Sequence, residues 1–139
     1  MNWLTWSLLS AVFAGLTAIL AKVGIKEVDS NLATAVRTAV VLVFAWSVAL
    51  ITQPASAVLG LSKKTWLFLV LSGLATGCSW LCYFRALQLG DASKVAPIDK
   101  LSVVFVLILA ALFLGESLTW KTALGGTLIT AGAVVLAWR

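Results

Sequence analysis

The chain of 139 residues is 62% hydrophobic and only 11% charged, with a mean hydropathy of +1.09. Soluble domains carry roughly 25% charged residues, so this composition excludes an ordinary soluble domain and indicates a single integral membrane domain over residues 1–139. The net charge of +5 does not come from a basic patch among polar residues, so we expect no nucleic-acid partner. The basic residues are better explained as topology markers and as pathway residues.

The residue types that most enzymes and metal sites use are scarce. There is no histidine, which removes the commonest metal ligand and the usual general base. Cys78 and Cys82 lie four apart in an apolar run, where two small packing residues are a simpler interpretation than a redox or metal pair. No nucleophile–base pair or pair of carboxylates at depth stands out. We therefore expect no enzymatic activity, no metal site and no cofactor.

Five apolar runs have the length of a membrane-spanning helix, which needs roughly 20 residues. They are continuous, whereas barrel strands alternate over about 10 residues, so the predicted fold is all-α: an integral membrane bundle of five transmembrane helices. Because no basic stretch precedes the first run and four more runs follow, we expect it to be a retained span rather than a signal peptide. The runs cover residues 3–21, 32–51, 66–87, 95–115 and 122–138.

Short links and small residues predict close antiparallel packing of consecutive helices. Small residues four apart, such as Gly73 and Gly77 in the third run and Gly126 and Thr130 in the fifth, allow backbones to approach in lipid. Pro97, near the start of the fourth run, is compatible either with a first helical turn or with a bend that shapes a cavity.

Four ionisable residues lie inside the apolar runs: Arg37, Arg85, Asp99 and Lys100. If the membrane side of the N-terminus is called side A and the opposite one side B, the chain direction places all four in the side-B half. A charge at the bilayer centre costs about 2.5–3.5 kcal/mol, so their convergence predicts a hydrated vestibule that opens to side B. Its mostly cationic lining would favour an anionic or carboxylate-bearing substrate. Alternatively, the cations extend to the lipid headgroups and Asp99 pairs with one of them.

Three aromatic residues, Trp80, Tyr83 and Phe84, directly precede Arg85. Aromatic side chains beside a buried cation could line a substrate path, and they could equally be ordinary helix packing.

A set of motifs follows from Tyr83 onward: the ALQLGDAS turn, the VAPI helix start, LFLGESLT, and a last helix with GGTLITAGAVVL. The first half adds AKVGI at the end of the first run and AVRTAVV in the second. Over nearly the whole chain these motifs resemble the EamA-type domain of the drug/metabolite transporter superfamily, in its short five-helix bacterial and archaeal branch. Arg37 matches the early arginine of the second helix, and Glu116 matches the acidic residue of the LGE turn. Arg85 and the charged pair in PIDKLSVVF depart from the usual family pattern.

The resemblance implies a multi-pass transporter of small metabolites in the cell (inner) membrane, in many members an exporter. We expect it to work by alternating access. Most members carry two such domains in inverted orientation, so this chain corresponds to half of a ten-helix inverted-repeat architecture. We expect Asp99 and Glu116 to have charge-pairing or structural roles. The predicted substrate pathway comprises Arg37, Trp80, Tyr83, Arg85, Asp99 and Lys100.

Two other functions are compatible with a small polytopic chain. A small multidrug-resistance-like proton antiporter would carry an acid in its first helix, and the first run here has none. A non-transporting membrane assembly or accessory protein would tolerate loss of the charges inside the spans.

A homodimer would complete the inverted-repeat architecture, because five spans enclose little space. The loops and termini place Lys22, Lys26, Lys94 and Arg139 on side B, against Lys63, Lys64 and Lys121 on side A. This small difference in lysine and arginine permits insertion in both orientations, and hence an antiparallel dimer. If the cations inside the spans also count, a single orientation with side B cytoplasmic is favoured.

Overall fold

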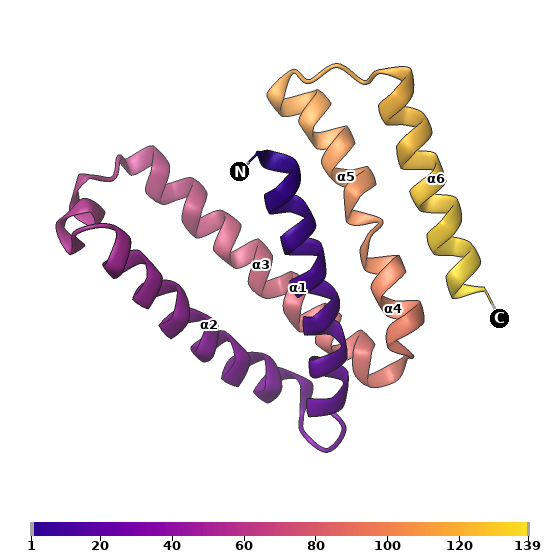
Figure 1. Ribbon diagram of the computed structural model, residues 1–139, viewed down its shortest axis with the longest axis horizontal. Coiled ribbons are helices and arrows are strands. Elements are labelled where there is room, and N and C mark those ends of the chain that lie inside the picture. The colour runs from indigo at the N-terminus through magenta and orange to yellow at the C-terminus, as the bar shows by residue number, and fades with distance from the viewer. Residues whose placement is uncertain (1, 139) are drawn as a thin grey trace. The chain divides into compact units, whose positions relative to one another are not determined.

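The computed structural model describes residues 2–138, and within that range it is all-helical, as the sequence predicts (Figure 1). Five helical segments there are long and apolar enough to cross a membrane. Arg139, which the sequence places on side B, lies outside the described residues. The elements are α1 (Trp3–Gly24), α2 (Ser30–Thr52), the short 3-10 helix η1 (Ala55–Gly60), α3 (Lys63–Leu89), α4 (Ala92–Asp99), α5 (Ser102–Leu109), the π-helical turn η2 (Ala110–Leu114) and α6 (Trp120–Ala137).

Polar caps extend the helices beyond the apolar runs. The Asp29 carboxylate accepts hydrogen bonds from the backbone N–H groups of Asn31 and Leu32, at 2.9 and 3.0 Å, so α2 begins at Ser30. The Thr119 hydroxyl caps α6 in the same way by accepting from the Thr122 N–H. Such caps satisfy N–H groups that have no partner within the helix, and this is why α2 and α6 begin before their apolar runs.

The fourth span is interrupted, whereas the sequence shows one continuous apolar run. Pro97 lies inside α4 rather than in its first turn. Proline has no N–H to continue the helical ladder, and the next turns tighten: the Lys100 N–H bonds to the Pro97 carbonyl at 3.1 Å, and the Leu101 N–H bonds to the Ile98 carbonyl at 3.0 Å. Pro97 therefore does not lie in a first helical turn, and the helix is interrupted directly after it.

The side-A end of this span closes with the LGE motif. The π-helical turn ends at Gly115, whose φ of 69° lies in the left-handed region that glycine adopts without strain. The Ala110 carbonyl accepts from the N–H groups of both Gly115 and Glu116. The motif therefore terminates the span and leads into the extended link before α6.

The chain forms two compact units. Unit 1 consists of the residues up to Lys22 together with those from Leu89 onward, and unit 2 consists of Val23–Gln88. In unit 1, α6 runs back beside α4 and α5 (Figure 1). A side chain at Gly126 would approach Leu107 to 3.1 Å, so this glycine permits close packing of α5 and α6. The Lys22 ammonium donates to the Gly90 carbonyl at 2.8 Å and so holds the link between α3 and α4.

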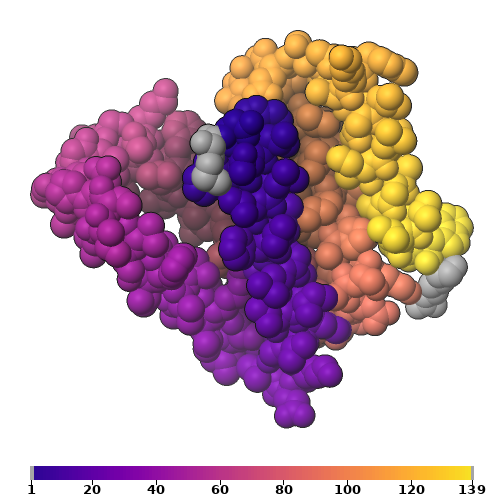
Figure 2. Space-filling view, viewed as in Figure 1, coloured from indigo at the N-terminus to yellow at the C-terminus, as the bar shows by residue number. Residues whose placement is uncertain are grey.

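Unit 2 consists mainly of α2 and α3, joined on side A through η1. Its buried residues lie at the side-B end: Ile25, Ser30, Thr34, Phe84 and Leu87. Residues 38–57 and 59–76 are all exposed, and the side chains around η1 lie on the surface in the space-filling view (Figure 2). Gly73 and Gly77 have open space where a side chain would project. Their small-residue spacing therefore does not mark a helix contact within this unit.

Candidate functional site

Arg37 lies on the aromatic residues of α3. Its guanidinium carbon is 4.1 Å from the centroid of the Trp80 ring and 5.5 Å from that of Phe84. Both distances are within the roughly 6 Å range of a cation–π interaction. In the sequence the aromatic residues directly precede Arg85, but in the structure Trp80 and Phe84 lie against Arg37 from the neighbouring helix.

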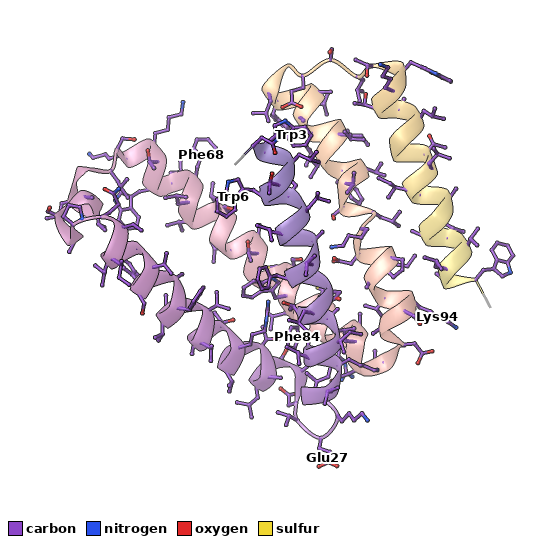
Figure 3. All side chains as sticks on the ribbon, viewed as in Figure 1. Trp3, Trp6, Glu27, Phe68, Phe84 and Lys94 are labelled. Carbon is purple, nitrogen blue, oxygen red and sulfur yellow. The ribbon has the colours of Figure 1, made fainter. Side chains whose placement is uncertain are left out.

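Helical periodicity explains this arrangement. Trp80, Phe84 and Gln88 are spaced by four residues and share one face of α3. Phe84, which is labelled in Figure 3, is 2% exposed and is the most buried residue of this face. On α2, Thr34 and Ser30 are buried about one and two turns before Arg37, respectively. The two faces meet only where α2 begins and α3 ends, so Arg37 lies at the border between the packed and the open part of unit 2.

The edges of the Arg37 guanidinium are available. No hydrogen bond or ion pair joins it to another residue in the part of the chain that the structure describes, and the side chain is half-buried. A guanidinium has five N–H donors in a planar fork that matches a carboxylate or phosphate. Aromatic faces hold the cation without using these donors, so Arg37 can bind an anion through two parallel hydrogen bonds.

Arg85 has a different environment, with a partner that sequence analysis missed. Its guanidinium donates to the Gln88 side-chain oxygen at 3.0 Å. The Gln88 side-chain nitrogen donates to the backbone carbonyls of Val28, at 2.6 Å, and Ile25, at 3.4 Å. Gln88 thus connects the end of α3 to the link that precedes α2. The signal in the sequence is an amide in an apolar run, four residues after Phe84 on the same helix face.

Asp99 and Lys100 lie at the break between α4 and α5, in unit 1. The Lys100 ammonium is 3.6 Å from the Asp99 carboxylate. Asp99 is half-buried and Lys100 is exposed, so water screens this pair and its contribution to stability is small. The interrupted helix places both charges at a break within an apolar span, a feature of transporter helices that line hydrated cavities.

A groove of about 460 Å³ runs between α5 and α6 in unit 1. Three threonines line it, and each hydroxyl donates to a carbonyl of its own helix. Since no lining residue is charged, this groove differs in chemistry from the surroundings of Arg37. The lining residues are Val104, Leu107, Ile108, Leu118, Thr122, Ala123, Gly126, Thr127, Thr130 and Ala131.

Glu116 is exposed, and its side chain makes no hydrogen bond or ion pair with residues 2–138. Its backbone N–H donates a hydrogen bond to the Ala110 carbonyl. Cys78 and Cys82 are exposed and unbridged. Among residues 2–138 there is no group of three or more His, Cys, Asp or Glu side chains that could hold a metal ion. The candidate substrate-binding groups are therefore the cationic and aromatic side chains.

Comparison with known proteins identifies the family. The EamA-like transporter family matches residues 1–138. The chain is also 52% identical, over 136 residues, to a Sinorhizobium protein described as an uncharacterized transporter in the cobO 3' region, with 98% of this chain and 96% of that protein covered. No solved structure matches the chain. The five apolar spans are consistent with this family match. The chain therefore belongs to the EamA-like transporter family of multi-pass membrane proteins.

Proposed function

We propose that this membrane transporter carries an anionic or carboxylate-bearing small molecule, and that Arg37 binds the anion. One observation supports this: Arg37 lies in an apolar span, packed on Trp80 and Phe84, with no acidic partner among residues 2–138. Holding a cation within a membrane is unfavourable unless another group compensates it. An anionic substrate supplies that compensation transiently, while it is bound.

The aromatic residues have two roles in this proposal. They hold the guanidinium by cation–π interactions, which reach about 2 kcal/mol where water is excluded. They also leave the N–H donors of the guanidinium free, because an aromatic ring attracts the cation without accepting a conventional hydrogen bond. Trp80 and Tyr83 would therefore form the apolar wall against which the substrate binds.

Arg85, Asp99 and Lys100 complete the proposed pathway. This part of the proposal rests on their common depth along the sequence, in the side-B half of their spans. Arg85 uses one guanidinium nitrogen on Gln88 and is otherwise exposed, and Asp99 limits the excess of positive charge through Lys100. A mostly cationic opening of this kind attracts anions and repels cations. Glu116 would act structurally, at the end of the fourth span.

Alternating access in a homodimer is the proposed working mode. Inverted-repeat transporters place their substrate between two similar halves, and a five-helix chain supplies one half. Because the flanking lysines and arginines differ little between the two sides, antiparallel pairing is compatible with the orientation rule. We propose outward transport across the cell (inner) membrane, as in many proteins that the motifs resemble.

The test is solute transport by the purified full chain in proteoliposomes. A panel of radiolabelled carboxylates is compared with organic cations of similar size, with and without a proton gradient. The proposal predicts uptake of at least one carboxylate, inhibition by other carboxylates, and loss of uptake in Arg37→Gln. Transport of organic cations alone, or carboxylate transport that Arg37→Gln leaves unchanged, would contradict it.

A further inference from the structure

The side chain of Gln88 joins two parts of unit 2 that are far apart in the sequence. Its nitrogen donates to the carbonyls of Val28, 60 residues earlier, and Ile25, 63 residues earlier, while its oxygen accepts from Arg85. A side-chain amide has a donor end and an acceptor end. A flipped amide would place its oxygen against two carbonyls and its NH₂ against a guanidinium, so both ends determine the same orientation.

The link that Gln88 holds determines where α2 begins. Ile25 in this link is 2% exposed, and the Val28 carbonyl accepts a hydrogen bond from Gln88. The next residue, Asp29, caps α2. Arg37 follows about two helical turns after this cap. The position of Arg37 relative to α3 is therefore set by a rigid helix whose preceding link is hydrogen-bonded to the end of α3.

One face of α3 carries both Gln88 and the aromatic residues that contact Arg37. Gln88 holds the link, and Phe84 and Trp80, one and two turns earlier on α3, contact Arg37. Hydrogen bonds of this type matter in lipid, because apolar contact alone gives helices little preference for one another over lipid tails. The exposed remainder of α2 and α3 offers no other contact of that strength within unit 2.

From these contacts we infer that Gln88 is a positioning residue: oriented by Arg85, it places Arg37 over Trp80. This inference rests on the proposed function for its consequence in transport. It also assigns Arg85 a definite task, which is to fix the Gln88 amide so that both of its N–H groups point at the link.

The test uses ¹⁹F NMR of the full chain labelled with 5-fluorotryptophan, in detergent micelles and without any ligand. Loss of one signal in Trp80→Phe identifies the Trp80 resonance, which is sensitive to a cation over its ring. Arg37→Gln defines how far this resonance moves when the cation is absent. Thr76→Val is the matched control on α3, since the Thr76 hydroxyl bonds only to the Ser72 carbonyl of its own helix.

Two substitutions of Gln88 separate its functions. Gln88→Leu removes both ends of the amide, whereas Gln88→Glu keeps an acceptor for Arg85 but has no donor for the carbonyls. We expect both to move the Trp80 resonance in the direction of Arg37→Gln, and Thr76→Val to leave it in place. Arg85→Leu should move it less, and should have no additional effect in the Gln88→Leu background, because Arg85 acts through Gln88.

A Trp80 resonance that moves in Arg37→Gln but stays in place in both Gln88 variants would overturn the inference. So would a resonance that no variant moves, Arg37→Gln included, since no guanidinium would then lie over the ring. The measurement needs no substrate. Failure of the carboxylate transport assay would therefore contradict the proposed function and leave this positioning role standing.

Discussion

The two ends of unit 2 are built from the same pair of helices, yet only one end is packed. At the side-B end, Phe84 and Leu87 are buried, Arg37 lies on Trp80, and Gln88 holds the link before α2. At the side-A end, residues 38–57 and 59–76 are exposed throughout. Polar side chains there, such as Ser47 and Thr76, bond only to carbonyls of their own helix.

This difference follows from the membrane as a solvent. Lipid tails are as apolar as leucine, so burying apolar surface between helices gains little, and close packing or polar contacts hold helices together. The side-B end has such polar contacts between α2 or its preceding link and α3, and the side-A end has none among residues 38–76. The same contacts are the ones that hold Arg37 within reach of a substrate, so packing and proposed binding depend on the same residues.

The largest expected effect is on stability and compares two phenylalanines of α3. Phe84 is 2% exposed and Phe68 is 59% exposed, and both are labelled in Figure 3. Truncation of a buried phenylalanine costs about 3–5 kcal/mol in water-soluble cores, so we expect Phe84→Ala to cost about 3 kcal/mol. Phe68→Ala should change the free energy of unfolding by less than about 0.5 kcal/mol. Reversible unfolding in mixed micelles measures both. Equal destabilisation by the two would show that the side-A end is packed as well.

The next effect concerns the charge and the shape of Arg37. Hydrogen bonds to charged groups contribute about 1.5–3 kcal/mol, so Arg37→Gln should lower the affinity for a transported carboxylate roughly 100-fold. Arg37→Lys keeps the charge but loses the planar fork, so its carboxylate affinity should lie between those of the unchanged protein and Arg37→Gln. Lys64→Gln at the side-A end removes the same charge and serves as the control. Affinities come from the concentration dependence of uptake. An equal loss in Lys64→Gln would indicate a general effect of net charge.

A smaller effect is expected for Trp80. Replacing it with leucine removes the cation–π contact and should weaken carboxylate affinity about tenfold, while phenylalanine should retain most of the affinity. Trp46→Leu on α2 is the matched substitution at the side-A end, where this tryptophan is exposed. The same uptake assay applies. A larger loss of carboxylate affinity in Trp46→Leu than in Trp80→Leu would indicate that the substrate binds at the side-A end, which would contradict a binding wall at Trp80.

The smallest effect distinguishes buried from exposed hydroxyl groups. Thr34 is buried and donates to the Ser30 carbonyl at 2.7 Å, whereas Thr76 makes the equivalent bond in an exposed position. Polar contacts within membrane bundles average about 0.6 kcal/mol, so Thr34→Val should destabilise by about that amount and Thr76→Val should be neutral. Unfolding in mixed micelles reports both values. A larger change in Thr76→Val would place a helix contact at the exposed end.

Much of this molecule follows from its sequence, because the membrane imposes the length and apolarity of each span. The all-α class and the five spans are confirmed, and caps such as Asp29 account for some of the differences at the helix ends. The break after Pro97 could not be predicted from hydrophobicity, because the fourth run remains apolar across it; the backbone hydrogen bonds reveal it. That Arg37 rather than Arg85 lies on the aromatic residues depends on how two helices face each other, which periodicity within one helix does not specify.

Gln88 shows the same limit of periodicity. Its spacing from Phe84 places it on the packed face of α3, but its partners are carbonyls more than fifty residues away. Backbone acceptors carry no signature in the sequence. The pathway residues Arg85, Asp99 and Lys100 remain a prediction that depends on a shared opening to side B.

Binding of an anionic substrate by Arg37 requires that water reach this residue, and thiol labelling measures that access. In a background with Cys78 and Cys82 replaced by serine, single cysteines at positions 37, 26 and 47 are exposed to a membrane-impermeant methanethiosulfonate reagent in proteoliposomes. We expect Lys26→Cys and Arg37→Cys both to react, because the side-B end would face a hydrated opening, and Ser47→Cys to be protected by lipid. An inert Arg37→Cys beside a reactive Lys26→Cys would contradict it, since a residue that binds an anionic substrate must be reached from water.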